Sequence, residues 1–315
     1  MNKNINEQLL DLCCDDVAPK IKRRKRTSYY IFQLVRVVLF TVCLVVFLYS
    51  VNSIIENFTD YEEGEQIYES IKNEFENLDG GGLNPPIYAS DKIIPLSKFD
   101  DMLVSDGVVP PIASNEEIEQ FLKVKNKLNI MKQEMPDLYG WITVPNTNID
   151  YPIMQGKDNS YYVTHTSDGK VNSLGAIFAD YRCTDPPHKT KNLVLYGHNI
   201  RSWGTMFNGI TNFFNPNYFK THRTIDVYTL DGIYQYEIIA VFETDIYDDY
   251  ARVNFPDLGY SEFITKTINK STNSTGAVEY DDSSRLITLS TCSNSFDKDM
   301  RYALVGILTK SITLD

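Results

Sequence analysis

Two short apolar runs in this sequence each end at a side chain suited to acyl-transfer chemistry. Residues 286–291 lead to Cys292, and alternation along a strand places Ser290 on the same face as this thiol. Residues 192–197 lead to His198. A thiolate can attack a carbonyl carbon, and an imidazole can protonate the departing amine near neutral pH. The two strand ends therefore predict a cysteine nucleophile with a histidine acid–base partner.

An arginine follows the cysteine at the start of the next apolar run. Eight mostly polar residues separate Cys292 from Arg301, and residues 302–308 are again apolar. If the two runs pair as a hairpin, the guanidinium lies beside the thiol, where it favours the thiolate and can donate to an oxyanion. Arg285 is the rival cation. We expect Arg301 to be the catalytic arginine.

Other reactive side chains have simpler interpretations. Cys183 lies in a loop with acidic neighbours, which disfavour a thiolate, so we expect an unreactive thiol. Asp180 and Asp297 could each orient the histidine, and their spacing does not choose between them. The cysteines have no zinc-type or disulfide-type spacing, and no Gly-rich phosphate loop is visible. No cofactor and no metal site are predicted.

Three spaced motifs resemble a known family. Thr-Leu-Ser-Thr-Cys at 288–292 resembles the Thr-Leu-x-Thr-Cys signature of the sortases, transpeptidases that attach proteins to the Gram-positive cell wall. Tyr-Gly-His-Asn at 196–199 is similar to their histidine motif, and Arg301 stands at the position of their arginine. The resemblance covers roughly residues 115–315, and it is greatest to class B in three segments: 140–155, 158–159 and 175–182.

The resemblance implies a reaction. Cys292 would attack a backbone carbonyl of a sorting signal of the Asn-Pro-x-Thr-x or Leu-Pro-x-Thr-Gly kind, cleave the signal after Thr and form a thioester. An amine of a peptidoglycan precursor would then resolve this thioester. From the residues we add Ser290 as a contact for the signal backbone, and the N–H of Ser293 as a second oxyanion donor beside Arg301. A pilin polymerase with a lysine acceptor, a surface cysteine peptidase and a non-enzymatic adhesin are the alternatives.

The N-terminal region predicts a membrane anchor. Residues 29–51 are almost wholly apolar and long enough to cross a bilayer, and a Lys/Arg cluster at 20–26 precedes them. Because basic residues favour the cytoplasmic side of a membrane span, this cluster predicts a cytoplasmic tail, 1–28, and an extracellular catalytic domain. A cleaved signal peptide is the alternative, but no small-x-small site follows the span. The net charge of −12 argues against nucleic acid as a partner.

The remaining chain predicts a stalk, a linker and a mainly β domain. We expect a stalk helix within 52–78 that begins at a capping box, Thr59–Glu62, and a second capping box at Ser114. The linker between them, 79–113, is rich in Gly and Pro and would serve as a spacer or as a lid. The catalytic domain, 114–315, contains eight β-rich runs: 140–144, 149–154, 175–179, 193–196, 224–229, 233–242, 286–291 and 302–309.

Such runs predict an antiparallel barrel or sandwich. The resemblance implies the closed eight-stranded sortase barrel, here preceded by the transmembrane helix and stalk. Two helical insertions interrupt the β pattern, at Met206–Phe219 and Pro256–Asn269. The resemblance implies that the second insertion forms a wall of the substrate groove.

Overall fold

The computed structural model describes residues 18–78, 114–256, 259–273 and 276–313. Its elements, in chain order, are α2 (Ala18–Asn77), α4 (Asn115–Glu134), β1 (Leu138–Thr143), β2 (Asp150–Met154), η1 (Tyr161–Val163), β3 (Ile177–Ala179), β4 (Asn192–Tyr196), β5 (Asn199–Ile200), β6 (Thr205–Met206), η2 (Phe207–Phe214), α5 (Pro216–Thr221), β7 (Thr224–Thr229), β8 (Gly232–Asp245), η3 (Asp249–Ala251), α6 (Tyr260–Lys270), β9 (Leu286–Cys292) and β10 (Met300–Thr313).

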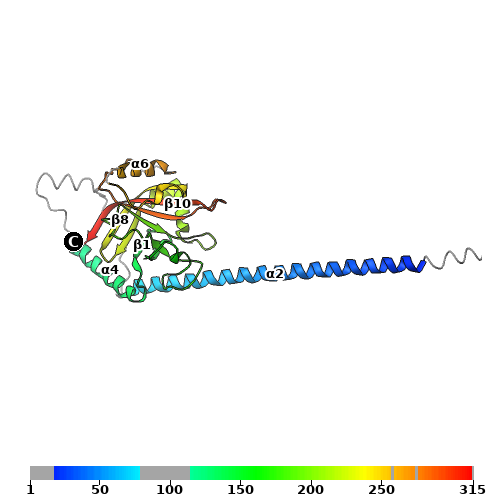
Figure 1. Ribbon diagram of the computed structural model, residues 1–315. Helices are drawn as coiled ribbons and strands as arrows, with labels where there is room; N and C mark the ends of the chain where they lie inside the picture. The colour runs from blue at the N-terminus through cyan, green and yellow to red at the C-terminus, as the bar shows by residue number, and fades with distance from the viewer. Residues whose placement is uncertain (1–17, 79–113, 257–258, 274–275, 314–315) are drawn as a thin grey trace, which may run out of the picture. The chain divides into compact units, whose positions relative to one another are not determined.

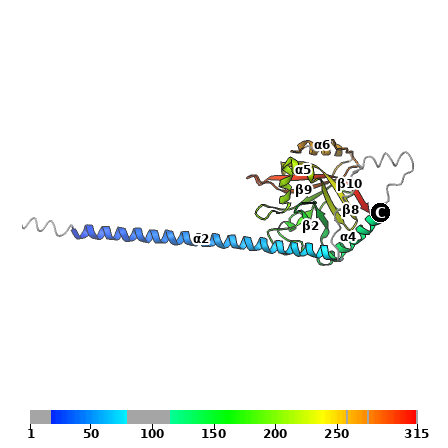
Figure 2. The same ribbon diagram turned by 180° about the vertical axis from the view of Figure 1, so that it is seen from behind.

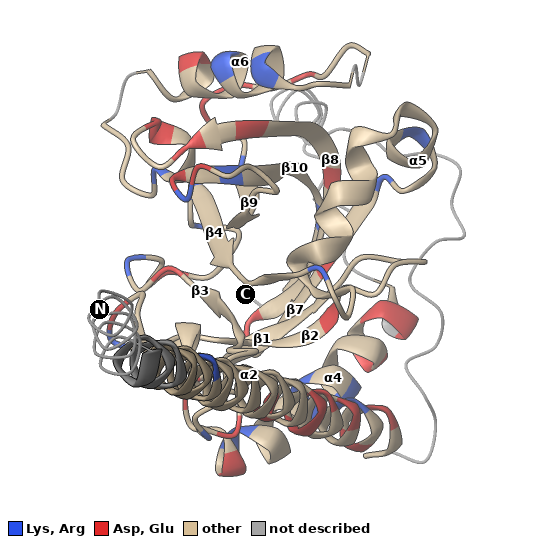
Figure 3. Cartoon of the chain, turned by 90° about the vertical axis from the view of Figure 1, so that its right-hand side faces the viewer, with Lys and Arg blue, Asp and Glu red and all other residues tan. Residues whose placement is uncertain are grey.

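Eight strands close into a barrel in the order β1-β2-β3-β4-β9-β10-β8-β7. Each of the eight runs expected from the sequence is one of these strands. Figure 1 labels β1, β8 and β10 among them. The view along the barrel shows the strands surrounding its interior, with α6 outside β8 and β10 (Figure 3). Most neighbours are antiparallel, but β2–β3 and β4–β9 are parallel pairs. The predicted closed eight-stranded barrel is confirmed.

Apolar side chains form three clusters around this sheet. One fills the barrel and includes Ile287 and Leu289 of β9. A second packs α4 and the end of α2 against the outside of β1, and a third lies under α6 and includes Leu286. The alternation in β9 therefore sends odd-numbered side chains inward and even-numbered ones outward, as the pattern predicted.

Helix α4 begins and ends where the sequence predicts. Ser114 is its N-cap, and the reciprocal bonds between Ser114 and Glu117 form the expected capping box. The helix ends at Glu134, just before Pro136. Its apolar stripe, which includes Phe121 and Leu128, is buried against the barrel.

The N-terminal helix differs from expectation. One helix, α2, covers both the predicted span and the predicted stalk, so no helix starts at Thr59. An N-cap needs a non-helical backbone, but Thr59 lies inside the helix and its hydroxyl donates to the carbonyls of Ile55 and Glu56. Residues 27–77 contain the one candidate membrane-spanning helix of the described chain.

The chain divides into two compact units at Thr59/Asp60. In the second unit the end of α2 packs on the barrel: the Phe75 ring stacks on Trp141 at 4.1 Å between centroids, and Lys72 pairs with Asp150 at 2.8 Å. Residues 60–77 therefore belong to the same compact unit as the barrel. The C-terminal end of α2 lies next to α4 in the view from behind (Figure 2). The linker, 79–113, lies outside the described residues.

The helical insertions begin and end differently from expectation. The first is a 3-10 helix, η2, followed by the short α5, because Asn215 interrupts the pattern and caps α5. The second, α6, begins at Tyr260 rather than at Pro256, after Gly259 at φ 98°. A left-handed backbone is easily adopted by glycine, and it stops the helix from extending toward the proline.

Candidate active site

Strand pairing brings the predicted cysteine, histidine and arginine to one edge of the barrel. In the antiparallel pair β9–β10, Arg301 lies directly opposite Cys292. In the parallel pair β4–β9, Tyr196 is level with Ser290, and the Gly197 N–H donates to the Ser290 carbonyl at 3.2 Å. This ladder ends there; His198 follows Tyr196 by two residues and Cys292 follows Ser290 by two, and both line the same cleft. Neighbouring strands lie roughly 5 Å apart, so Cys292 has one candidate partner on each side.

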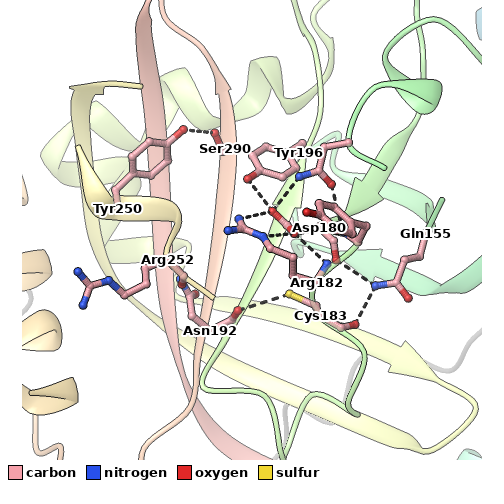
Figure 4. Close-up of polar contacts among 11 residues, drawn as sticks. Gln155, Asp180, Arg182, Cys183, Asn192, Tyr196, Tyr250, Arg252 and Ser290 are labelled. Atoms are coloured by element: carbon pink, nitrogen blue, oxygen red, sulfur yellow. Dashed lines mark hydrogen bonds and ion pairs between the residues drawn. The ribbon is translucent and has the colours of Figure 1, made fainter. Parts of the chain in front are cut away.

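These side chains open onto a cleft of about 580 Å³. Its lining also includes Ser290 and Tyr250, whose hydroxyl groups are hydrogen-bonded at 2.8 Å (Figure 4). Cys292 is exposed. A thiol, an imidazole and a guanidinium at the rim of a cleft of this size can perform acyl transfer on an extended peptide.

The imidazole is oriented by a backbone group. His198 Nε2 lies 2.8 Å from the carbonyl oxygen of Val163, which can only accept a hydrogen bond. Nε2 therefore carries the proton, and Nδ1 is the ring nitrogen left for proton transfer. Asp180 bonds to Arg182, Asn159 and Tyr196, whereas Asp297 accepts from the Asp299 N–H. Neither of the two aspartates considered from the sequence contacts the histidine.

The arginine is held by the turn that precedes its strand. Arg301 Nη1 donates to the carbonyls of Lys298 and Met300, at 2.6 Å and 3.0 Å, and these two bonds orient the guanidinium. Within the described residues, Arg301 forms no ion pair with a carboxylate. The rival, Arg285, precedes β9 at its other end and donates to the carbonyl of His188. The seven residue steps from Arg285 to Cys292 span roughly 23 Å along a strand, which excludes Arg285 from contact with the thiol.

The expected role of Ser293 needs correction. Its N–H donates to the Met300 carbonyl at 3.0 Å, which continues the β9–β10 ladder, and Ser293 does not line the cleft. This N–H is therefore not available to an oxyanion in the observed conformation. Ser290 does line the cleft, with its hydroxyl bonded to Tyr250. A contact between Ser290 and a peptide backbone stays a prediction.

Asn199 links the histidine segment to the cysteine. Its Nδ2 donates to the Cys292 carbonyl at 2.8 Å and lies 3.1 Å from Asn294 Oδ1. Arg201 donates to the Ser293 carbonyl at 2.9 Å. These bonds hold the backbone at Cys292 and Ser293 from the segment that carries His198.

An ion pair with a buried carboxylate lies next to the cleft, which Arg182 lines. The Asp180 side chain has no exposed surface and accepts from Arg182 Nε at 2.8 Å and Nη2 at 2.7 Å, and from Asn159 and Tyr196 (Figure 4). Burial alone would raise the pKa of Asp180, but the hydrogen bonds from Arg182 and Asn159 outweigh it, so this pKa lies below its usual value.

Cys183 is separated from this chemistry. It is buried, and burial raises the pKa of its thiol to about 11. Its sulfur lies 3.6 Å from the Asn192 carbonyl, inside the structure rather than in the cleft (Figure 4). The expectation of an unreactive thiol agrees with this environment, although burial, more than the neighbouring carboxylates, is the main cause.

The wall of the cleft differs from what the resemblance implied. Residues 246 and 248–254, including η3, line it, whereas no described residue of α6 does. Helix α6 instead packs Phe263 and Ile264 over the outer face of the sheet. Neither this wall nor the Val163 carbonyl was predictable from the sequence, because an unpatterned loop and a backbone acceptor leave no signature. Asn199 belongs to the histidine motif, but the motif did not indicate its bond to the Cys292 carbonyl. Among the described residues, no cluster of three or more His, Cys, Asp or Glu could hold a metal.

Comparisons with known proteins agree with this geometry. Residues 142–309 match the sortase domain family. The chain is 32% identical to sortase B of Listeria monocytogenes over 61% of this chain and 76% of that protein, and 29% identical to sortase B of Staphylococcus aureus over 58% and 74%. The crystal structure of sortase B from Clostridium perfringens aligns with a TM-score of 0.54 at 29% identity, over 58% of this chain and 99% of that one. Because the family match covers more than half of its length, this chain belongs to the sortase family of cysteine transpeptidases, and its relatives place it in class B.

Proposed function

We propose that this sortase is anchored in the membrane by α2, cleaves a C-terminal sorting signal after Thr and transfers the protein to a cell-wall amine. The observation that supports the proposal is that Cys292, His198 and Arg301 line one cleft, with Arg301 opposite Cys292 in the β9–β10 register. The Lys/Arg cluster at 20–26 supports a cytoplasmic N-terminus and an extracellular barrel. The segments 1–28, 29–51, 52–78, 79–113 and 114–315 would then be tail, span, stalk, linker and catalytic domain.

In the first half-reaction, the Cys292 thiolate attacks the carbonyl carbon of the signal's Thr. A C–S bond forms, and the oxyanion accepts hydrogen bonds from Arg301. As the C–N bond breaks, His198 gives a proton from Nδ1 to the departing amine, and a thioester remains. The Val163 carbonyl supports this step because it holds the imidazole with the Nδ1 edge free.

In the second half-reaction, an amine of a peptidoglycan precursor attacks the thioester. His198 accepts the amine proton at Nδ1, a new amide forms and the Cys292 sulfur leaves as a thiolate. Water in place of the amine would give hydrolysis, and a pilin lysine would give polymerisation.

The test uses the full chain in detergent micelles with quenched fluorogenic peptides carrying Asn-Pro-x-Thr or Leu-Pro-x-Thr-Gly signals, with and without triglycine. We expect cleavage, a triglycine adduct by mass spectrometry, and loss of both in Cys292→Ala. Arg301→Ala should lower kcat by about 10²–10³, as for loss of one oxyanion donor. Cys183→Ala is the matched control and should stay active. Undiminished cleavage by Cys292→Ala would refute the proposal, and an unchanged product with triglycine would favour a peptidase.

A further inference from the structure

The loop that orients His198 is the long connection between β2 and β3. It contains η1, and its Val163 carbonyl is the acceptor for His198 Nε2. The same loop returns past the histidine at Gly175. A Cβ at this glycine would lie 2.7 Å from the carbonyl oxygens of Tyr162 and Val163, and 3.0 Å from His198 Cδ2. With a φ of 61°, Gly175 permits a contact that no larger residue would allow.

One contact between helix α2 and this loop is made by the Tyr68 hydroxyl group. Tyr68 Oη donates to the Gly175 carbonyl at 2.6 Å and accepts from the Ser167 N–H at 3.3 Å. The Tyr68 side chain is only 5% exposed. Burial raises the pKa of Tyr68 far above its usual value, so the hydroxyl stays a donor over the working pH range. Two parts of the loop therefore meet at a single group of the helix.

A second contact with the same loop is made by Asp60, about two helical turns before Tyr68. The Asp60 carboxylate accepts from the Ser173 N–H at 2.9 Å, and its carbonyl accepts from Asn172 Nδ2 at 2.6 Å. Gly64 lies between the two contacts, and a Cβ there would lie 2.7 Å from Asn172 Oδ1 and 3.0 Å from Leu174 Cδ2. The helix thus fits the loop over two turns.

We propose that the end of α2 is a positioning element for the catalytic histidine, with Tyr68 as its positioning residue. Three contacts connect Tyr68 with His198. The Tyr68 hydroxyl donates to the Gly175 carbonyl, and Gly175 packs closely against the Val163 peptide. The Val163 carbonyl in turn accepts from His198 Nε2. This inference rests on the proposed role of His198. Cys292 and Arg301 do not depend on the loop, because the β9–β10 ladder holds them.

The inference predicts a selective defect in proton transfer. An amide leaving group needs the proton from His198, whereas a thioester analogue of the same peptide releases a thiolate without one. In Tyr68→Phe we expect the saturating acylation rate to fall about tenfold with the amide peptide, at an unchanged half-saturation concentration. With the thioester analogue, the loss should be no more than about threefold.

The experiment measures acylation in single turnovers of the full chain in detergent micelles, with the best-cleaved peptide of the panel above. Tyr260→Phe is the matched control: it removes another buried tyrosine hydroxyl, one that donates to the Lys191 carbonyl, and should leave both rates unchanged. If Tyr68→Phe behaves like Tyr260→Phe, or slows both substrates equally, the inference is wrong. His198→Ala separates the two proposals, because full amide cleavage by that variant would overturn the role of His198 itself.

Discussion

Removing the guanidinium of Arg182 leaves a carboxylate buried without its counter-charge. Arg182→Met keeps the length of the side chain but removes both bonds to Asp180, which has no exposed surface. Breaking a buried ion pair costs about 3–5 kcal/mol. We expect about 3 kcal/mol, because the guanidinium is 39% exposed and Asn159 and Tyr196 still donate to the carboxylate.

The cost should depend on pH with a definite sign. In the wild type the pKa of Asp180 is lowered, so its stabilisation is present above the unfolded pKa, about 3.9, and is lost as the pH falls through the folded value. In Arg182→Met, Asp180 is still buried but has lost its guanidinium partner, so the folded protein favours the protonated carboxyl group. Lowering the pH protonates Asp180 and so reduces the loss of stability caused by the substitution. The stability gap between wild type and variant should therefore narrow from pH 7 toward pH 4.

Thermal unfolding of the full chain in detergent, followed by tryptophan fluorescence, measures both effects. About 3 kcal/mol corresponds to a decrease in Tm of roughly 6–12 °C for a unit of this size. Arg252→Met is the control, because its ion pair with Asp249 is exposed on both sides and contributes at most about 1 kcal/mol. Asp180→Asn combined with Arg182→Met should recover most of the loss. The reasoning would be refuted if the double variant lost as much Tm as Arg182→Met alone. It would also be refuted if the stability difference between wild type and Arg182→Met became larger at acidic pH.

Two further outcomes follow from the contacts of the site. Asn199→Ala removes the bond to the Cys292 carbonyl and should lower kcat about tenfold in the peptide assay with little change in Tm; an unchanged kcat would show that the ladder alone fixes the nucleophile. Iodoacetamide at pH 7 should label the exposed Cys292 while the buried Cys183, whose pKa is about 11, reacts only after denaturation, as peptide mapping would show; labelling of Cys183 in the folded protein would contradict this.

The strands were predictable because alternation and turn residues are local signals. All eight runs became barrel strands, and β9 presents the faces that its alternation predicted. Strand ends were less predictable: β10 continues to Thr313 because β8 provides partners down to Gly232. The length of a ladder depends on a distant partner, which the local sequence does not contain.

The helix starts show where local signals mislead. Thr59–Glu62 has the pattern of a capping box, as does Ser114–Glu117, but only the second caps a helix. The difference lies in what precedes them, since a cap forms where the backbone upstream is non-helical and the span upstream of Thr59 is already a helix. A motif therefore predicts a helix start only together with its upstream neighbours.

The three catalytic candidates also differ in how firmly the fold holds them. The β9–β10 ladder sets the spacing of Cys292 and Arg301, so motif and spacing were enough to place them side by side. His198 follows the end of the adjacent strand, β4, and its ring direction depends on the Val163 carbonyl, in a loop that the Tyr68 hydroxyl of α2 contacts. A change that loosens residues 60–77 of α2 should therefore impair the proposed proton transfer by His198 while leaving Cys292 and Arg301 in register.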